Sequence, residues 1–75
     1  MSEEEFLEAY KRYLRRNAPE LLEKLDGMLF NADPRAYDLV ERGYYMYLQF
    51  GFEKAFNYMT NRLEAIAKNM KEEAT

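Results

Sequence analysis

The chain has 75 residues, of which 48% are hydrophobic and 33% are charged, and its 11 Lys and Arg against 14 Asp and Glu give a formal charge of −3. One domain covering residues 1–75 is expected at this length, and the hydrophobic content argues against disorder. Cys and His are absent, which excludes disulfides, thiolate and imidazole metal sites, and Ser–His or Cys–His nucleophile pairs.

The sequence gives no signal for export or membrane insertion. Its longest unbroken apolar run, Tyr44–Leu48, is far shorter than the roughly 20 residues of a membrane-spanning helix. The start Met-Ser-Glu-Glu-Glu is acidic, whereas a signal peptide begins with a basic and then an apolar segment. We therefore expect a cytoplasmic location and no membrane partner.

Apolar residues recur at steps of three and four along nearly the whole chain, which predicts helices rather than strands. Ser2 and Glu5 have the spacing of a capping box, in which each side chain bonds the other's backbone N–H at a helix start. We expect the first helix over residues 3–16. Its last turns carry cations, which interact favourably with the helix dipole: Lys11, Arg12, Arg15 and Arg16.

A second helix is predicted over residues 18–30. Asn17 is expected to cap it, and Pro19 occupies a first turn that needs no N–H from it. Gly27 allows two positions for the end of this helix. Either the helix continues through Gly27 at a cost of about 1 kcal/mol against alanine, or it ends at Asp26 with Gly27 as a left-handed cap.

The Asp33-Pro34 pair is a third start signal, an acidic cap followed by proline at the first helical position. The helix that it begins is expected over residues 34–50, and Gly51 is expected to end it. A fourth helix follows over residues 52–71, with a charged tail at 71–75.

These elements predict an all-α fold, a compact bundle of four short helices. The connectors are only a few residues long, so sequential helices are expected to be neighbours and roughly antiparallel. The expected core consists of Phe6, Leu7, Tyr10, Leu14, Leu21, Leu25, Val40, Tyr44, Phe56, Met59, Leu63 and Ile66.

The helix over 34–50 has more apolar surface than one buried face needs. At about 100° per residue its apolar arc spans roughly 200° or more, against the stripe of about 100° typical of a surface helix. One reading makes it the central helix, buried on several sides, with tyrosine hydroxyls reaching water. The residues that this reading explains are Leu39, Tyr44, Tyr47 and Phe50.

A second reading assigns part of the surplus to a binding surface. Tyr45 and Met46 share a side of the helix with polar residues, and Tyr and Met are enriched in interface cores. On the fourth helix Tyr58 lies off the apolar stripe. The predicted partner-binding residues are Tyr45, Met46, Gln49, Phe50, Asn57, Tyr58, Asn61 and Arg62. Phe30 is either a further exposed candidate or an anchor folded over the core beside Pro34.

No pattern in the sequence predicts catalysis, and we expect neither an enzyme nor a metal or cofactor site. The apolar stripes carry no acid, hydroxyl nucleophiles have no base at a motif spacing, and a Gly-rich phosphate loop is absent. The basic residues at the end of the first helix suggest a nucleic-acid patch. The net charge of −3 argues against it, because counterion release needs a dominant positive face.

The chain resembles a computationally designed helical miniprotein binder rather than a natural family. The resemblance rests on Ser2-Glu3-Glu4-Glu5, Asn17-Ala18-Pro19-Glu20 and Asp33-Pro34 at successive helix starts, and on Glu, Lys and Arg at most exposed helical positions. It implies a rigid helical face that presents an aromatic cluster to a protein target. Gly27, Gly43, Asn57 and Asn61 depart from the design rules, and function is expected at such departures.

The sequence therefore predicts a non-catalytic module that binds a protein target of unknown identity through the helices over 34–50 and 52–71. We expect a monomer rather than a homodimer, and no nucleic-acid or membrane partner. Two alternatives remain. One is a natural regulatory or inhibitory protein that self-associates through the same face, and the other is a folding scaffold that binds nothing.

Overall fold

The computed structural model describes residues 1–73, which form four helices: α1 (Glu3–Asn17), α2 (Pro19–Phe30), α3 (Pro34–Phe50) and α4 (Phe52–Glu73). The predicted all-α bundle is confirmed, and the predicted bounds agree to within two residues. The end of the predicted charged tail, residues 74 and 75, lies outside the described residues. Within residues 1–73 no helix is both long and apolar enough to cross a membrane.

Three of the predicted start and stop signals are confirmed. Ser2 and Glu5 form the capping box, with backbone-to-side-chain distances of 2.9 and 3.1 Å, and the bond from the Ser2 backbone N–H lowers the pKa of Glu5. The Asp33 carboxylate accepts from the Arg35 backbone N–H at 2.9 Å at the start of α3. Gly51 ends α3 with a φ of 92°, a conformation that favours glycine.

The predicted capping role of Asn17 is wrong. Asn17 is the last residue of α1, and its side-chain amide donates to the Tyr13 carbonyl oxygen at 2.8 Å. A capping residue needs an extended backbone, which a residue inside the preceding helix does not have. Ala18 takes the position instead and offers no side-chain acceptor.

The α2–α3 turn settles where the second helix ends. Helix α2 continues through Gly27 to Phe30, and the left-handed residue is Ala32, with a φ of 55°. The backbone N–H of Asp33 donates to the Met28 carbonyl oxygen, and that of Ala32 to the Leu29 carbonyl oxygen. These two bonds form a Schellman motif, which satisfies the last carbonyl groups of α2 without a glycine.

Exchanging the residue types at these two positions is expected to stabilise the protein. A Cβ added at Gly27 meets no atom within 4 Å, so Gly27→Ala is expected to gain about 0.5–1 kcal/mol of unfolding free energy from helix propensity. Ala32→Gly relieves the left-handed strain and is expected to gain a similar amount. Urea denaturation of both single variants and the double variant tests this, and a loss of stability in either single variant would contradict it.

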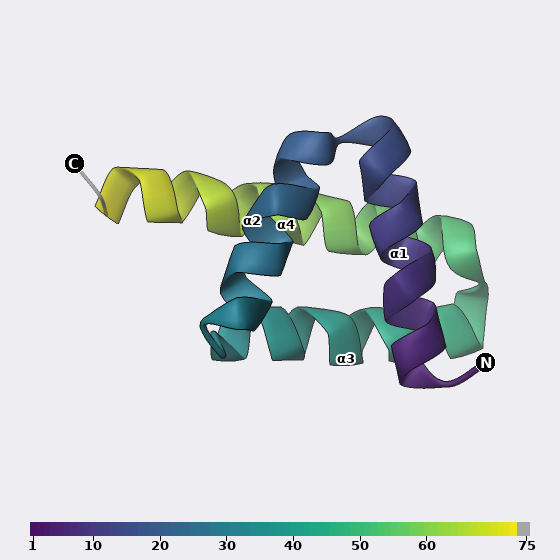
Figure 1. The fold of residues 1–75 in the computed structure, drawn as a ribbon. Helices are drawn as coiled ribbons and strands as arrows, with labels where there is room; N and C mark the ends of the chain where they lie inside the picture. Colours follow the sequence, from purple (N-terminus) through teal and green to yellow (C-terminus); the bar gives the residue numbers. More distant parts are fainter. Residues whose placement is uncertain (74–75) are drawn as a thin grey trace.

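The four helices form two antiparallel hairpins, α1–α2 and α3–α4. Figure 1 shows the first hairpin lying across one side of the second. The expectation that all sequential helices are antiparallel is therefore wrong for α2 and α3. The turn at Asn31–Asp33 redirects the chain sharply, so α3 starts across the end of α2 rather than alongside it.

The core lies between the crossed hairpins. Nine of the twelve predicted core residues are buried, while Leu7, Tyr44 and Phe56 are half-buried and pack against the core. Four further apolar residues are buried beside them: Met28, Ala36, Leu39 and Ala55.

Seven aromatic rings form a continuous cluster where α1 meets α3 and α4. Phe6 is fully buried at its centre, and its ring centroid lies 5.3–6.4 Å from those of four neighbours. The neighbours are Tyr44, Tyr47, Phe52 and Phe56, and Tyr10 and Tyr13 join them through Phe56. Rings at these centroid separations attract one another beyond their burial from water. The cluster thus absorbs part of the tyrosine surplus of α3.

Tyr10 gives this core a predicted dependence on pH. Its hydroxyl lies 3.1 Å from the Thr60 hydroxyl, and burial raises the pKa of Tyr10 to about 12. The unfolded chain releases the same proton near pH 10, so the folded state holds it longer. This contribution to stability is complete below about pH 10 and is lost as the pH rises toward about 12.

The free energy of unfolding is therefore expected to fall more steeply above about pH 10 in the wild type than in the Tyr10→Phe variant, which lacks the proton. Urea denaturation at several pH values between about 8 and 11.5 measures both slopes. Equal slopes in the two proteins would contradict the prediction.

Candidate functional site

One side of the α3–α4 hairpin is not covered by α1 and α2 (Figure 1), and helical spacing places most of the predicted partner-binding residues on that side. Gly43 marks the line of contact, because a Cβ there would lie 2.6 Å from Cγ of Met59. Counted around the axis of α3 at about 100° per residue, one flank comprises the positions about 60° to 160° from Gly43 on the side of Met46. We call this flank, with the matching flank of α4, the outer hairpin face. Its residues include Asp38, Arg42, Tyr45, Met46, Gln49, Lys54, Tyr58, Asn61 and Arg62.

Six of the eight predicted residues lie on this face, at unequal exposure, whereas Phe50 lies about 20° from Gly43 at the end of α3 and so falls outside the face. Tyr45 is 59% exposed and Phe50 58%. Met46 and Tyr58 are half-buried and pack against the core, so they form the floor of the face rather than its protruding part. The others are exposed: Gln49, Asn57, Asn61 and Arg62. Asn57 lies at the margin of the face, on the far side of α4 from α3.

Cations dominate the charge of the outer hairpin face. Arg42 lies 3.0 Å from both carboxylate oxygens of Asp38, and this bond and then the nearby Tyr58 hydroxyl raise the pKa of Arg42. The Lys54 ammonium lies 5.2 Å from the ring centroid of Phe50. Arg62 lines a shallow groove between α3 and α4. This face is thus positive in a chain whose total charge is −3.

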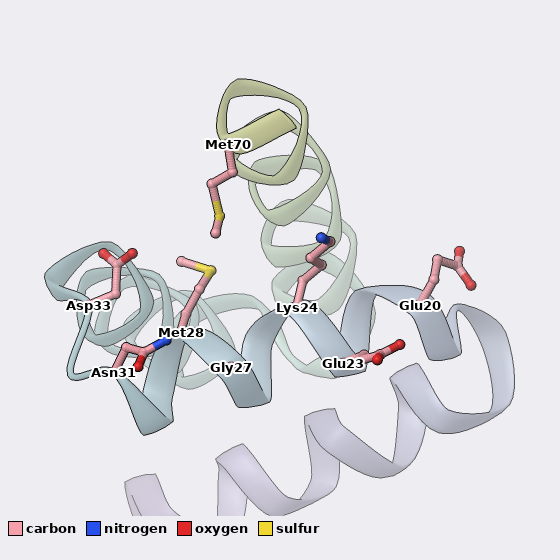
Figure 2. Close-up of a pocket in the computed structure, with 8 residues that line it drawn as sticks. All are labelled: Glu20, Glu23, Lys24, Gly27, Met28, Asn31, Asp33 and Met70. Carbon is pink, nitrogen blue, oxygen red and sulfur yellow. The ribbon is translucent and has the colours of Figure 1, made fainter. Parts of the chain in front are cut away.

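Figure 2 shows a different pocket, between α2 and the last turns of α4, with a volume of about 390 Å³. Met70 reaches from α4 toward Met28, and the backbone of Gly27 forms part of the wall. The carboxylates of Glu20 and Glu23 point away from it (Figure 2). Among the described residues there is no group of three acids placed to hold a metal ion. The charged side chains that line this pocket do not point toward a common centre.

Gly43 and Gly27, which both interrupt helical patterns, have different explanations. Gly43 is buried where α3 crosses Met59, so packing accounts for it without any function. Gly27 is exposed with open space around its Cα, so packing does not account for it.

Sequence reasoning missed a second exposed apolar surface. At about 100° per residue Tyr37 and Leu48 fall on the same side of α3 as the buried Val40, yet they are 52% and 58% exposed. Phe30 is 90% exposed, which excludes the alternative of an anchor over the core and leaves that of an exposed candidate. The sequence does contain a signal for this second surface. A separate apolar stripe on α3 is marked by the steps of seven and four residues between Tyr37, Tyr44 and Leu48. Helix α1 covers only part of that stripe.

The fold and these surfaces define a small four-helix domain whose α3–α4 hairpin is covered on one side only. Comparison of the chain with protein-family models, with curated protein sequences and with solved structures found no match.

Proposed function

We propose that the chain is a non-catalytic binding module that holds a protein partner on the outer hairpin face. The observation that carries the proposal is the exposed side chain of Tyr45 beside the half-buried Met46, on the uncovered side of α3. An exposed tyrosine over an adaptable methionine floor supplies a large contact area at low entropic cost. The capped, charge-balanced helices also fit a designed-type miniprotein, whose rigid face is made for such a contact.

The polar residues around Tyr45 suit the rim of an interface. Gln49 and Asn61 offer amide donors and acceptors, and Arg62 offers a planar cation. The excess of cations on the face favours a partner with acidic residues opposite Arg62 and Lys54, since complementary charge speeds association and excludes wrong partners. Tyr45 would bury its ring against the target while these groups satisfy polar atoms at the edge.

The test compares matched substitutions on the two flanks of α3. Tyr45→Ala is expected to weaken binding of a captured partner about tenfold or more, because it removes the main aromatic contact. Tyr37→Ala removes an equally exposed tyrosine from the other flank and is expected to change affinity less than about twofold. Isothermal calorimetry measures both, with circular dichroism to show that helicity is intact. Equal losses for the two variants would contradict the assigned face.

Arg62→Ala provides a second test of the same face. It is expected to slow association and to reduce the dependence of affinity on salt, because Arg62 is exposed and acts through charge. Arg15→Ala, which removes an exposed cation from α1, is the matched control.

A further inference from the structure

A groove on the opposite flank of α3 lies between that helix, the start of α1 and the end of α2. Its volume is about 450 Å³. Leu7 of α1 and Leu29 of α2 form its apolar floor, and both are half-buried. Tyr37 forms one wall from α3. We call it the acidic groove, after the three glutamates described below.

Two exposed apolar residues lie on the same helices as the lining of the acidic groove, outside the lining itself. Phe30 follows Leu29 and is almost fully exposed, and Leu48 follows Tyr37 along the same flank of α3. Tyr44 lies between Tyr37 and Leu48 along this flank of α3. Its hydroxyl donates a hydrogen bond to the Met1 carbonyl oxygen at 2.8 Å, which holds the side chain in place. A concave floor of apolar side chains beside an exposed tyrosine is typical of an interaction site rather than of a solvated face.

The charges at the groove are all of one sign. Glu3, Glu4 and Glu41 line it, the described lining residues include no Lys or Arg, and none of the three forms an ion pair within residues 1–73. The dipole of α1 accounts for Glu3 and Glu4, which lie in its first turn. The helix dipole does not account for Glu41, which lies in the middle of α3 on the same flank as the exposed Tyr37 and Leu48.

This combination of charge and shape selects one kind of occupant. An acidic protein, a nucleic acid or an anionic membrane surface would be repelled by the three carboxylates. An amphipathic helix with Lys or Arg beside its apolar stripe would place apolar side chains on Leu7 and Leu29. Its cations would then lie near Glu41 and the start of α1, in the helix-in-groove mode of peptide recognition.

We propose that the acidic groove binds a basic amphipathic helix of a partner protein. The site is separate from the outer hairpin face and does not rest on the function proposed for that face. The two surfaces have opposite charge and lie on different flanks of α3.

The test uses the full chain labelled with ¹⁵N and two synthetic helical peptides of 15 residues. One carries Leu at the apolar positions and Lys elsewhere, and the other has Glu in place of Lys. The Leu/Lys peptide is expected to shift the backbone amide signals of Leu7, Leu29, Tyr37 and Glu41. The Leu/Glu peptide is expected to bind at least about tenfold more weakly, since each unfavourable charge contact adds to the next.

Matched variants locate the contact. Glu41→Lys is expected to weaken binding of the Leu/Lys peptide about fivefold, whereas Glu23→Lys makes the same charge change on an exposed position of α2 outside the groove and has little effect. Tyr37→Ser is expected to weaken binding and Tyr45→Ser to leave it unchanged.

Three results would overturn the proposal. The first is equal binding of the two peptides, and the second is a set of shifts centred on the outer hairpin face. The third is a Tyr37-dependent dimer of the chain itself, because a second copy would then occupy the groove. A failure of Tyr45→Ala to affect a captured partner sinks only the function proposed for the outer hairpin face, so the two failures are distinguishable.

Discussion

Phe6→Ala is expected to lower the free energy of unfolding by about 3–5 kcal/mol, the largest effect of any single substitution proposed for this chain. The Phe6 side chain is fully buried, and four other rings surround it. Truncation removes the ring from the junction of α1, α3 and α4 and leaves a cavity that three helices must close. A chain of this length has a total stability of about 4–11 kcal/mol, so the variant is expected to be partly unfolded at room temperature.

Two further variants keep this prediction testable if Phe6→Ala does not fold. Phe6→Leu retains most of the volume and is expected to cost about 1–2 kcal/mol. Phe50→Ala removes an exposed ring and is expected to cost less than about 1 kcal/mol. Urea denaturation followed by circular dichroism ranks the three. If Phe6→Leu were no more costly than Phe50→Ala, the ring cluster would not be the centre of the fold.

Gly43→Ala is expected to destabilise the protein by about 2 kcal/mol, although alanine has the higher helix propensity. The new Cβ would lie 2.6 Å from Cγ of Met59, so this fully buried side chain must shift to admit it. Overpacking at this helix crossing therefore exceeds the propensity gain of about 1 kcal/mol. Gly27→Ala, where nothing is within 4 Å, is the control and has the opposite sign.

A double-mutant cycle shows whether Met59 is the cause. Met59→Ala alone is expected to cost about 2–5 kcal/mol, because it empties a fully buried site. In that background Gly43→Ala meets no side chain and is expected to become neutral or stabilising. An unchanged cost of Gly43→Ala in both backgrounds would show that something other than contact with Met59 requires glycine.

The features predicted correctly from the sequence are those set by bonds between near neighbours. The capping box at Ser2 and the proline start at Pro34 each depend on residues within one helical turn, so their sequence spacing is sufficient. Gly51 was predictable for the same reason, since a left-handed stop needs only one residue type at one place. The four helix ranges followed from these signals.

The errors concern features that depend on distant parts of the chain or on unusual local choices. Ala32 adopts the left-handed conformation that the sequence assigns to glycine, so the choice between an end of α2 at Asp26 and at Phe30 stayed open, and the sharp turn into α3 was not predicted. That turn produces the crossed hairpins. The crossing of the two hairpins decides which part of α3 is covered, and this is why Tyr37 and Leu48 are exposed although they share the side of α3 that holds Val40.

The aromatic surplus of α3 has no single explanation. Tyr44 and Tyr47 join the ring cluster, as the reading of α3 as a central helix expected. Tyr45 lies on the outer hairpin face, and Tyr37 lies at the acidic groove. Phe50, which the central-helix reading placed inside, is mostly exposed. Helical periodicity identified the excess correctly, but three separate surfaces share it.

The central claim is that the outer hairpin face is left open for a foreign partner and not covered by a second copy of the chain. Size-exclusion chromatography with multi-angle light scattering over a hundredfold range of concentration tests this most directly. The account predicts a constant mass near the 9.0 kDa of one chain. A mass that rises toward twice that value, and returns to one chain in the Tyr45→Ala variant, would contradict it by showing that the chain covers this face itself.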